Sequence, residues 1–283
     1  MPELPEVETM VRGIRPHAEG RTILDVEFCR CPRRPIEIIP RRAAFRSRVR
    51  GATIRRVFRL AKRAVLELDA DISIVIEPRM TGLLLVSDPP TTQHRRVCWH
   101  LRPKSGLRNS FEFWDRRGLG TVRLLDTQQM DHLRSRLGPD AMQIEPADWK
   151  RQLAGTSRHI KVALLDQSLV AGIGNLYASE ILHMAGISPF KRSNLLPPNA
   201  LRRLADATQA VLSDAILHEG STLSDGTYRN ALNKDGGYQN YHRVYDREGQ
   251  VCSCCERGII RRAVQAQRST FYCPICQRTP RKT

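Results

Sequence analysis

The first residues of the chain offer groups that could form a covalent bond to a substrate. Proline follows the initiator methionine, so removal of Met1 would leave Pro2 with a terminal secondary amine. A terminal α-amino group titrates near ~8, so part of it is neutral and nucleophilic at pH 7, and such amines attack carbonyl-like carbons to form imines. Glu3 follows directly and could donate or accept a proton during that attack. The alternative interpretation is an ordinary, solvated start of a chain.

Four cysteines near the C-terminus have the spacing of a metal site. Cys252 and Cys255 form one Cys-x2-Cys pair, Cys273 and Cys276 form a second, and seventeen residues lie between the pairs. This spacing is typical of a structural zinc site of four thiolates, which leaves no open position for a substrate. Two disulfides or a redox Cys-x2-Cys are the alternatives. We expect one structural Zn2+ ion.

The composition limits the class of partner and the compartment. The chain has 46 Lys and Arg against 29 Asp and Glu, a net charge of +17, and residues 41–63 hold ten basic residues and no acidic one. Such a charge suits a polyanion, and nucleic acid is favoured over a membrane because no basic amphipathic helix with an aromatic face stands out. Charges throughout the first fifteen residues argue against a secretory signal. The remaining cysteines show no disulfide plan, which indicates a reducing, cytoplasmic setting.

The elements that must hold these groups form a β-rich part and a helical part. Apolar residues at helical spacing predict a short helix after the N-terminus, ended by Pro16 and Gly20. Residues 23–125 have a β pattern, with short strands separated by Pro and Gly, which favours a two-layered β-sandwich. The clearest predicted strands are 64–68, 72–76, 83–86, 96–101 and 110–114.

Helical periodicity returns from about residue 146, with one apolar helix face predicted to run from Ile160 to Leu169. A glycine turn at 170–174 precedes Asn175, which is a good N-cap for the next helix. A further helix is predicted at 199–219, before a polar, glycine-rich segment, 221–240, of the kind that forms a functional lid or is disordered. The fold class is therefore α+β and multidomain. The predicted parts are a β-sandwich domain with a flanking helix (1–130), a linker (131–150), a helical domain (151–245) and a zinc-binding hairpin (246–283).

Taken together, these features resemble the formamidopyrimidine-DNA glycosylase family, bacterial enzymes that remove oxidised purines from DNA. The resemblance covers almost the full chain: it begins with the octapeptide 1–8 and recurs at Lys62, Met80, 115–120, 172–180 and 252–277. It implies a helix-two-turn-helix in the helical domain and a bifunctional glycosylase and apurinic/apyrimidinic lyase. The implied partner is duplex DNA with oxidised bases or abasic sites. The implied setting is a monomer in the bacterial cytoplasm, associated with the nucleoid through DNA.

The resemblance also implies roles for individual residues. Pro2 would attack C1′ of the deoxyribose and Glu3 would assist opening of the sugar ring. Lys62 would serve β-elimination and Arg268 δ-elimination. A second set would contact DNA, as wedge, base reader or phosphate ligand: Met80, His94, Arg117, Leu119, Arg158, Lys161 and Asn175.

One segment departs from the family pattern. Residues 115–120 resemble the family loop Asp-x-Arg-Arg-Phe-Gly, but Gly118 stands in place of an arginine and Leu119 in place of the aromatic wedge. We expect Gly118 to add backbone freedom beside Arg117, and Leu119 to hold an opened duplex less tightly than phenylalanine would.

Three other functions remain open at this stage. An endonuclease VIII-like glycosylase for oxidised pyrimidines would have the same fold, although Leu4, Lys161 and the long polar segment favour the purine-directed branch. A zinc-finger protein that only binds damaged DNA is the second, but Pro2 and Glu3 are intact. A basic chromatin protein is the third, and it explains the charge without explaining the N-terminus.

Overall fold

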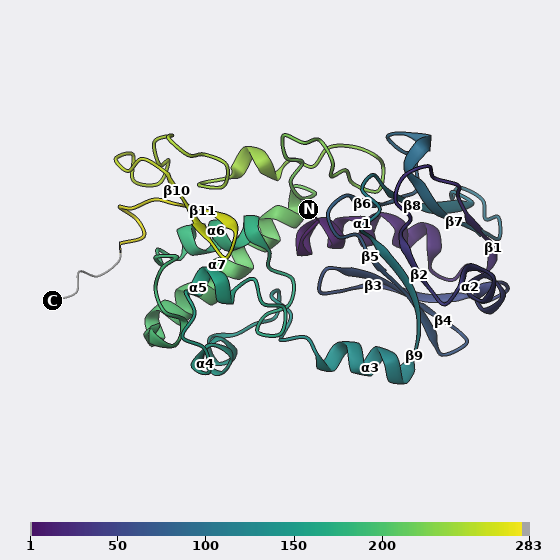
Figure 1. Cartoon of the computed structure of the whole chain (residues 1–283), viewed down its shortest axis with the longest axis horizontal. Coiled ribbons are helices and arrows are strands. Elements are labelled where there is room, and N and C mark those ends of the chain that lie inside the picture. The colour runs from purple at the N-terminus through teal and green to yellow at the C-terminus, as the bar shows by residue number, and fades with distance from the viewer. Residues whose placement is uncertain (1, 279–283) are drawn as a thin grey trace. The chain divides into compact units, whose positions relative to one another are not determined.

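The computed structural model describes residues 2–278, and the chain divides into two compact units (Figure 1). The first unit contains the chain up to Ser135 together with Ile216–Gln239. The second contains Arg136–Ala215 and the chain from Asn240 onward. Segment 216–239, which the sequence analysis groups with the helical domain, therefore folds with the N-terminal unit.

The first unit is the predicted β-sandwich. One sheet has the strand order β2-β9-β5-β4-β3 and the other the order β1-β7-β8-β6; neighbouring strands are antiparallel except β2 and β9. A single apolar core joins the inner faces of both sheets. The strands are β1 (Ile23–Phe28), β2 (Glu37–Ile39), β3 (Ile54–Leu60), β4 (Arg63–Leu68), β5 (Ile72–Glu77), β6 (Gly82–Leu85), β7 (Arg95–Leu101), β8 (Ser110–Asp115) and β9 (Thr121–Asp126).

Helix α1 (Leu4–Ala18) packs against β3 and β4 of one sheet and against β6 and β8 of the other (Figure 1). Its apolar residues are fully buried, which fixes its N-terminus rigidly. The prediction that Pro16 ends the helix is wrong, since the helix continues to Ala18. A proline near a helix end removes only one hydrogen bond, and burial of Ile14 and Ala18 offsets that loss.

Two helices lie where the sequence predicts none. Helix α2 (Arg42–Val49) lies within the stretch predicted as β, and α3 (Thr127–Ser135) covers part of the predicted linker. In α2 only Phe45 and Val49, four residues apart, are buried. Two apolar positions in a run of arginines give too weak a periodicity to separate a helix from a strand.

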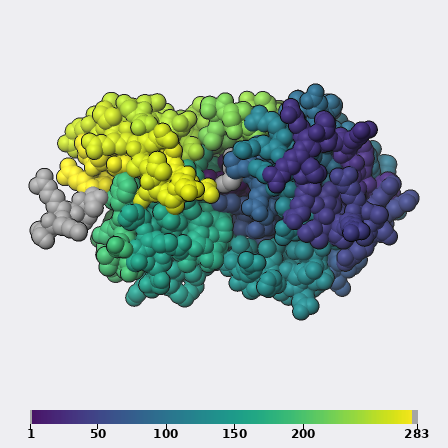
Figure 2. Space-filling model, in the orientation of Figure 1, coloured from purple at the N-terminus to yellow at the C-terminus, as the bar shows by residue number. Residues whose placement is uncertain are grey.

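The second unit consists of helices and a C-terminal β-hairpin. Figure 2 shows the C-terminal segment, in yellow, lying against the helical part, in teal, and β11 contacts α6. The single helix face predicted from Ile160 is interrupted, because α5 is only one turn long and turns follow it. The elements are α4 (Pro146–Ala154), α5 (Ile160–Ala163), α6 (Asn175–Met184), the 3-10 turn η2 (Ser193–Leu195), α7 (Pro198–Leu217, whose last two residues belong to the first unit), β10 (Arg261–Gln265) and β11 (Arg268–Tyr272).

Hydropathy along the helices bears on membrane association. Within residues 2–278, no helix combines the length and the apolar character that crossing a bilayer requires.

Candidate active site

The N-terminal residues are buried at the start of α1. Pro2 and Glu3 are both buried, and the main-chain N–H of Glu3 donates to Oε2 of Glu6 at 2.8 Å. The other carboxylate oxygen of Glu6, Oε1, accepts from the main-chain N–H of Ser221 at 3.0 Å. One buried carboxylate thus joins the N-terminus to segment 221–240.

Segment 221–240, predicted as a lid or a disordered loop, is folded onto the sandwich up to Gln239. The phenol of Tyr228 is buried and donates to the carbonyl of Glu219 at 2.9 Å. Thr222 Oγ1 donates to the carbonyl of Tyr228 at 2.8 Å, and the carbonyl of Ala231 accepts from Val86 N at 2.9 Å. The first two bonds shape the segment itself, whereas the Val86–Ala231 bond joins it to the sandwich, so the segment is held by the first unit.

Lys62 lies at the tip of the hairpin between β3 and β4. It forms a two-residue turn with Ala61, whose φ of +54° is the left-handed conformation that such tight turns require. The Lys62 side chain is half-buried. A hairpin between two paired strands gives this amine a fixed base, as a proton-transfer group requires.

A buried aspartate ties the Met80 turn to the loop of Arg117. Asp115 is fully buried; its Oδ1 accepts from Thr81 Oγ1 and from Arg117 N at 3.1 Å, and its Oδ2 accepts from Gly120 N at 2.8 Å. The 37 % exposed Met80 therefore lies on a turn joined through Thr81 to the loop that carries the exposed Arg117. The two predicted duplex-inserting residues are positioned by one carboxylate.

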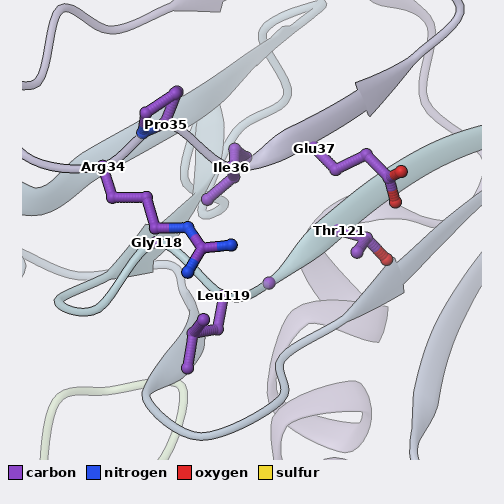
Figure 3. A pocket seen from close by; sticks show the side chains of 8 residues that line it. Arg34, Pro35, Ile36, Glu37, Gly118, Leu119 and Thr121 are labelled. Atoms are coloured by element: carbon purple, nitrogen blue, oxygen red, sulfur yellow. The ribbon is translucent and has the colours of Figure 1, made fainter.

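The structure gives Gly118 a different role from the one expected. Its φ is +65°, and a Cβ at this position would lie 2.1 Å from the carbonyl oxygen of Arg34. The glycine is needed for the close approach of two backbones, whereas the sequence suggested only added backbone freedom beside Arg117. Arg34 and Leu119 lie at the loop end of a pocket of about 510 Å³, with Glu37 and Thr121 at its strand end (Figure 3).

His94 lies beside this loop, at the end of the 3-10 turn η1 (Thr92–His94). Its ring packs edge-to-face on Trp114, with the ring centroids 5.4 Å apart. Burial and the neighbouring charges of Arg96, Arg33 and Arg116 lower the pKa of His94, so the imidazole is neutral at pH 7. A neutral imidazole can both donate and accept a hydrogen bond, so His94 can bind DNA in a way that the neighbouring arginines cannot.

In the second unit, Lys161 and Asn175 form a buried polar link. Lys161 is fully buried and its Nζ donates to Asn175 Oδ1, while Asn175 Nδ2 donates to the carbonyl of Ser269 at 3.0 Å. The prediction that Asn175 caps α6 is wrong, because Gly174 is the N-cap and Asn175 is the first helical residue. Instead, the Asn175 side chain links the first turn of α6 by a hydrogen bond to Ser269, the residue after Arg268.

The remaining two predicted cations of this unit differ in their surroundings. Arg158 is exposed but donates to Asp166 Oδ2 at 2.9 Å and to Thr156 Oγ1 at 3.0 Å, so its charge is already partly offset. Arg268 is exposed at the first position of β11. Of the two, Arg268 is the better placed to bind a phosphate.

The four predicted metal ligands meet at one point. The Sγ atoms of Cys252, Cys255, Cys273 and Cys276 all lie within 4.8 Å of one another. The Cys252–Cys276 and Cys255–Cys273 pairs are 3.8 and 3.7 Å apart. A tetrahedron with Zn–S bonds of about 2.3 Å has edges of about 3.8 Å, so the cluster fits a zinc ion. The cluster can bind a metal ion, and the separations exclude two disulfides in this arrangement.

The surroundings of the cluster act differently on its thiols. Main-chain N–H groups of Arg257 and Gly258 lower the pKa of Cys255 to about 6, whereas burial raises the pKa of Cys273 and Cys276. A Cβ at Gly258 would lie 2.5 Å from Cys273 Sγ, so only glycine brings its backbone this close. His183 of α6 places Nε2 3.3 Å from Cys252 Sγ, in the position of an outer-shell donor to a metal-bound sulfur.

Glu180 has a structural role that the sequence does not predict. Its carboxylate, fully buried in α6, accepts from the main-chain N–H groups of Arg243, Val244 and Tyr245 at 2.8, 2.9 and 2.7 Å. It thereby joins the helix to the segment that leads into the metal hairpin. The sequence shows only a glutamate among the apolar positions of a helix. It does not show that residues 243–245 are its hydrogen-bond partners.

We expect Glu180→Ala to lower the free energy of unfolding of the second unit by about 3 kcal/mol or more, because one buried and two partly buried N–H groups lose their acceptor. Glu180→Gln keeps one acceptor oxygen and is expected to cost less. The exposed Glu248, changed to Ala, is the control and should stay within ~0.5 kcal/mol of wild type. Denaturant unfolding of the three variants checks this, and equal midpoints for Glu180→Ala and Glu248→Ala would contradict it.

Comparison with known proteins defines the class and then the family. Residues 1–122 match the formamidopyrimidine-DNA glycosylase N-terminal domain, and residues 137–227 match its H2TH domain. The formamidopyrimidine-DNA glycosylase of Chloroflexus aurantiacus is 39% identical over 281 residues, 99% of this chain and 98% of the relative. That of Phenylobacterium zucineum is 37% identical over 98% of this chain and all of the relative.

Solved structures agree with these matches. The MutM (Fpg) protein of Thermus thermophilus has a TM-score of 0.83 and 35% identity, with 98% of each chain covered. The Lactococcus lactis Fpg, in complex with DNA that contains an abasic site, has a TM-score of 0.84 and 29% identity over 98% of this chain and 100% of that one. The fold and these likenesses define a DNA glycosylase of base excision repair. The chain belongs to the formamidopyrimidine-DNA glycosylase family.

Proposed function

We propose that this chain is a bifunctional DNA glycosylase and abasic-site lyase that excises formamidopyrimidines and 8-oxoguanine from duplex DNA. The observation that carries the proposal is the double anchoring of the N-terminus, where Glu6 holds both Glu3 and Ser221 through main-chain N–H groups. This arrangement fixes a terminal amine on a rigid, buried helix. A relative supports the substrate class: a Lactococcus lactis Fpg mutant has been solved with DNA that contains Fapy-dG, at 30% identity.

The glycosylase step uses the first two residues. After removal of Met1, the Pro2 nitrogen attacks C1′ of the flipped nucleotide, and the bond from C1′ to the base breaks. Glu3 donates a proton to the ring oxygen, which opens the sugar and leaves an iminium between Pro2 and C1′. Burial of both side chains keeps water from competing with the amine.

The lyase steps follow from the iminium. It acidifies the C2′ proton, whose loss expels the 3′ phosphate, and Lys62 at its hairpin tip serves this transfer. A second elimination expels the 5′ phosphate, and the exposed Arg268 serves that one. Both residues are cations that can also bind the departing phosphates.

The remaining residues bind DNA. Met80 fills the gap that the flipped nucleotide leaves, while Arg117 and Leu119 face the orphaned base. His94, Arg158 and Asn175 act with the turn before α6 on the DNA backbone, since helix N-termini readily hold phosphates. The buried Lys161 acts through Asn175, whose side chain it holds. The four cysteines bind one Zn2+ ion, which holds the hairpin of Arg268 in shape. We further propose that the enzyme acts as a monomer in the bacterial cytoplasm, where DNA holds it at the nucleoid.

Base release tests the substrate class. Duplexes with 8-oxoguanine, formamidopyrimidine or thymine glycol are incubated with the protein, and the free base is measured under single-turnover conditions. Faster release of the two purine lesions supports the proposal. Faster release of thymine glycol would instead identify an endonuclease VIII-like enzyme, and binding without release of any base would identify a damage-binding protein.

We expect Leu119→Phe to bind lesion-containing duplex more tightly than wild type. Base–aromatic stacking contributes about 1–3 kcal/mol per base, and leucine has no π-face. Excision from single-stranded substrate should change little. Leu24→Phe, at an exposed leucine of β1 outside the loop, is the matched control. Equal affinities for wild type, Leu119→Phe and Leu119→Ala would show that Leu119 is not the wedge.

A further inference from the structure

A second cluster of metal-ligating side chains lies on the outer face of the four-stranded sheet. Glu27 of β1 and Cys98 of β7 are direct cross-strand partners, and His100 lies two residues further along β7. One ligand atom from each of these three residues falls within 4.8 Å of the other two. Because Val26 and Trp99 are in the core, the alternation of the strands directs these three side chains to the opposite face.

The separation of His100 from Glu27 matches one edge of a tetrahedral metal site. His100 Nε2 lies 3.4 Å from Glu27 Oε2, and bonds of about 2.0–2.1 Å from zinc to nitrogen and oxygen give a tetrahedral edge of about 3.4 Å. Cys29, which directly follows β1, places Sγ 3.8 Å from Glu27 Oε1. Its thiol lies outside the group of three whose ligand atoms are all within 4.8 Å of one another, so it would complete the site by turning toward the ion. The four-cysteine cluster of the same chain shows the same kind of agreement, with edges of 3.7 and 3.8 Å.

The burial of the cluster also suits a metal. Cys98 is only 3% exposed although it lies on the outer face, whereas the side chains of Glu27 and His100 are about half exposed. A metal can therefore enter from solvent and reach a sheltered thiol. Arg95, whose positive charge acts on both thiols, is held by Glu112 at 2.6 Å, which offsets that charge.

A reactive-thiol role fits this cluster less well. Burial, followed by the negative charge of Glu27, raises the pKa of Cys29 to about 11, so this thiol is not a ready nucleophile. Two sulfurs, an imidazole and a carboxylate are, by contrast, a ligand set that zinc accepts. We propose that Glu27, Cys29, Cys98 and His100 bind a second zinc ion, which fastens β1 to β7.

Metal stoichiometry tests the proposal. The full-length protein is equilibrated with a small excess of Zn2+, passed through a desalting column and analysed for zinc per chain. We expect two ions in wild type and one in both Cys98→Ala and His100→Ala. His100 is half exposed, so its removal does not threaten the fold. Cys254→Ser, at an exposed cysteine outside both clusters, is the control and should keep two ions.

The test compares the zinc content of wild type with that of each variant. The four-cysteine site is the same in all of these proteins, so the difference depends neither on that site nor on the proposed function. Cobalt offers a second measurement: the wild-type protein should take up one more equivalent with thiolate charge-transfer absorption than Cys98→Ala does. Added zinc should also raise the Tm of wild type by more than that of His100→Ala, because a ligand that binds only the folded state stabilises it. Equal metal content in wild type, Cys98→Ala and His100→Ala would overturn the proposal, whether that content is one ion or two.

Discussion

Replacement of Pro2 by glycine, or retention of Met1, is expected to remove the covalent complex that borohydride traps on a lesion-containing duplex. With Met1 retained, no secondary amine is present to attack C1′. With glycine, the rigid ring that fixes the amine is lost, and a misplacement of about 1 Å in such a site costs on the order of 10²-fold in rate. Affinity for the same duplex should change little, since phosphate contacts supply most of it.

The matched control for this experiment is Pro5→Ala. Pro5 belongs to the first turn of α1 and is also buried, but it offers no amine. We expect Pro5→Ala to retain trapping. A preparation that keeps Met1 and shows full lyase activity would remove Pro2 from the mechanism.

The second large effect is expected from Cys273→Ser. The loss of one thiolate should release the metal, and because structural zinc sites and their small folds form together, the β10–β11 hairpin should unfold. DNA affinity should then fall by about tenfold or more, since Arg268 begins β11 and loses its scaffold. Zinc analysis, amide exchange of residues 261–272 and duplex affinity measure the three effects.

Cys254→Ser serves again as the control, because Cys254 is exposed beside two ligands and does not belong to the cluster. It should retain metal, hairpin and affinity. Wild-type protein without zinc, or Cys273→Ser with unchanged metal content, would contradict the assignment of the four cysteines.

The sequence was sufficient to predict those elements whose own hydrophobic pattern matches their burial in the folded protein. The five clearest strands alternate or run apolar for four to seven residues, and all appear in the sandwich within two residues of the predicted bounds. The cysteine spacing predicted the four-ligand cluster because each Cys-x2-Cys pair forms within one turn. Helix α2 was missed because its two buried residues are hidden in a basic run.

Contacts between distant residues could not be predicted from sequence. Asn175 has the local pattern of an N-cap, but the partners of its side chain are Lys161 and Ser269. From the sequence, Gly118 is expected to add backbone freedom. In the structure, the carbonyl of Arg34 lies so close to it that only a glycine fits. In both cases a tertiary neighbour decides the role, and neither neighbour leaves a signal at the position itself.

The most direct test of the central claim is to map the trapped adduct. Wild-type protein is reduced with borohydride on an 8-oxoguanine duplex, digested with nuclease and protease, and the modified peptide is sequenced by mass spectrometry. We predict that the sugar remnant is attached to the nitrogen of Pro2 in a peptide that begins at that residue. An adduct on Lys62 or on another lysine, or no adduct although the base is released, would contradict the account.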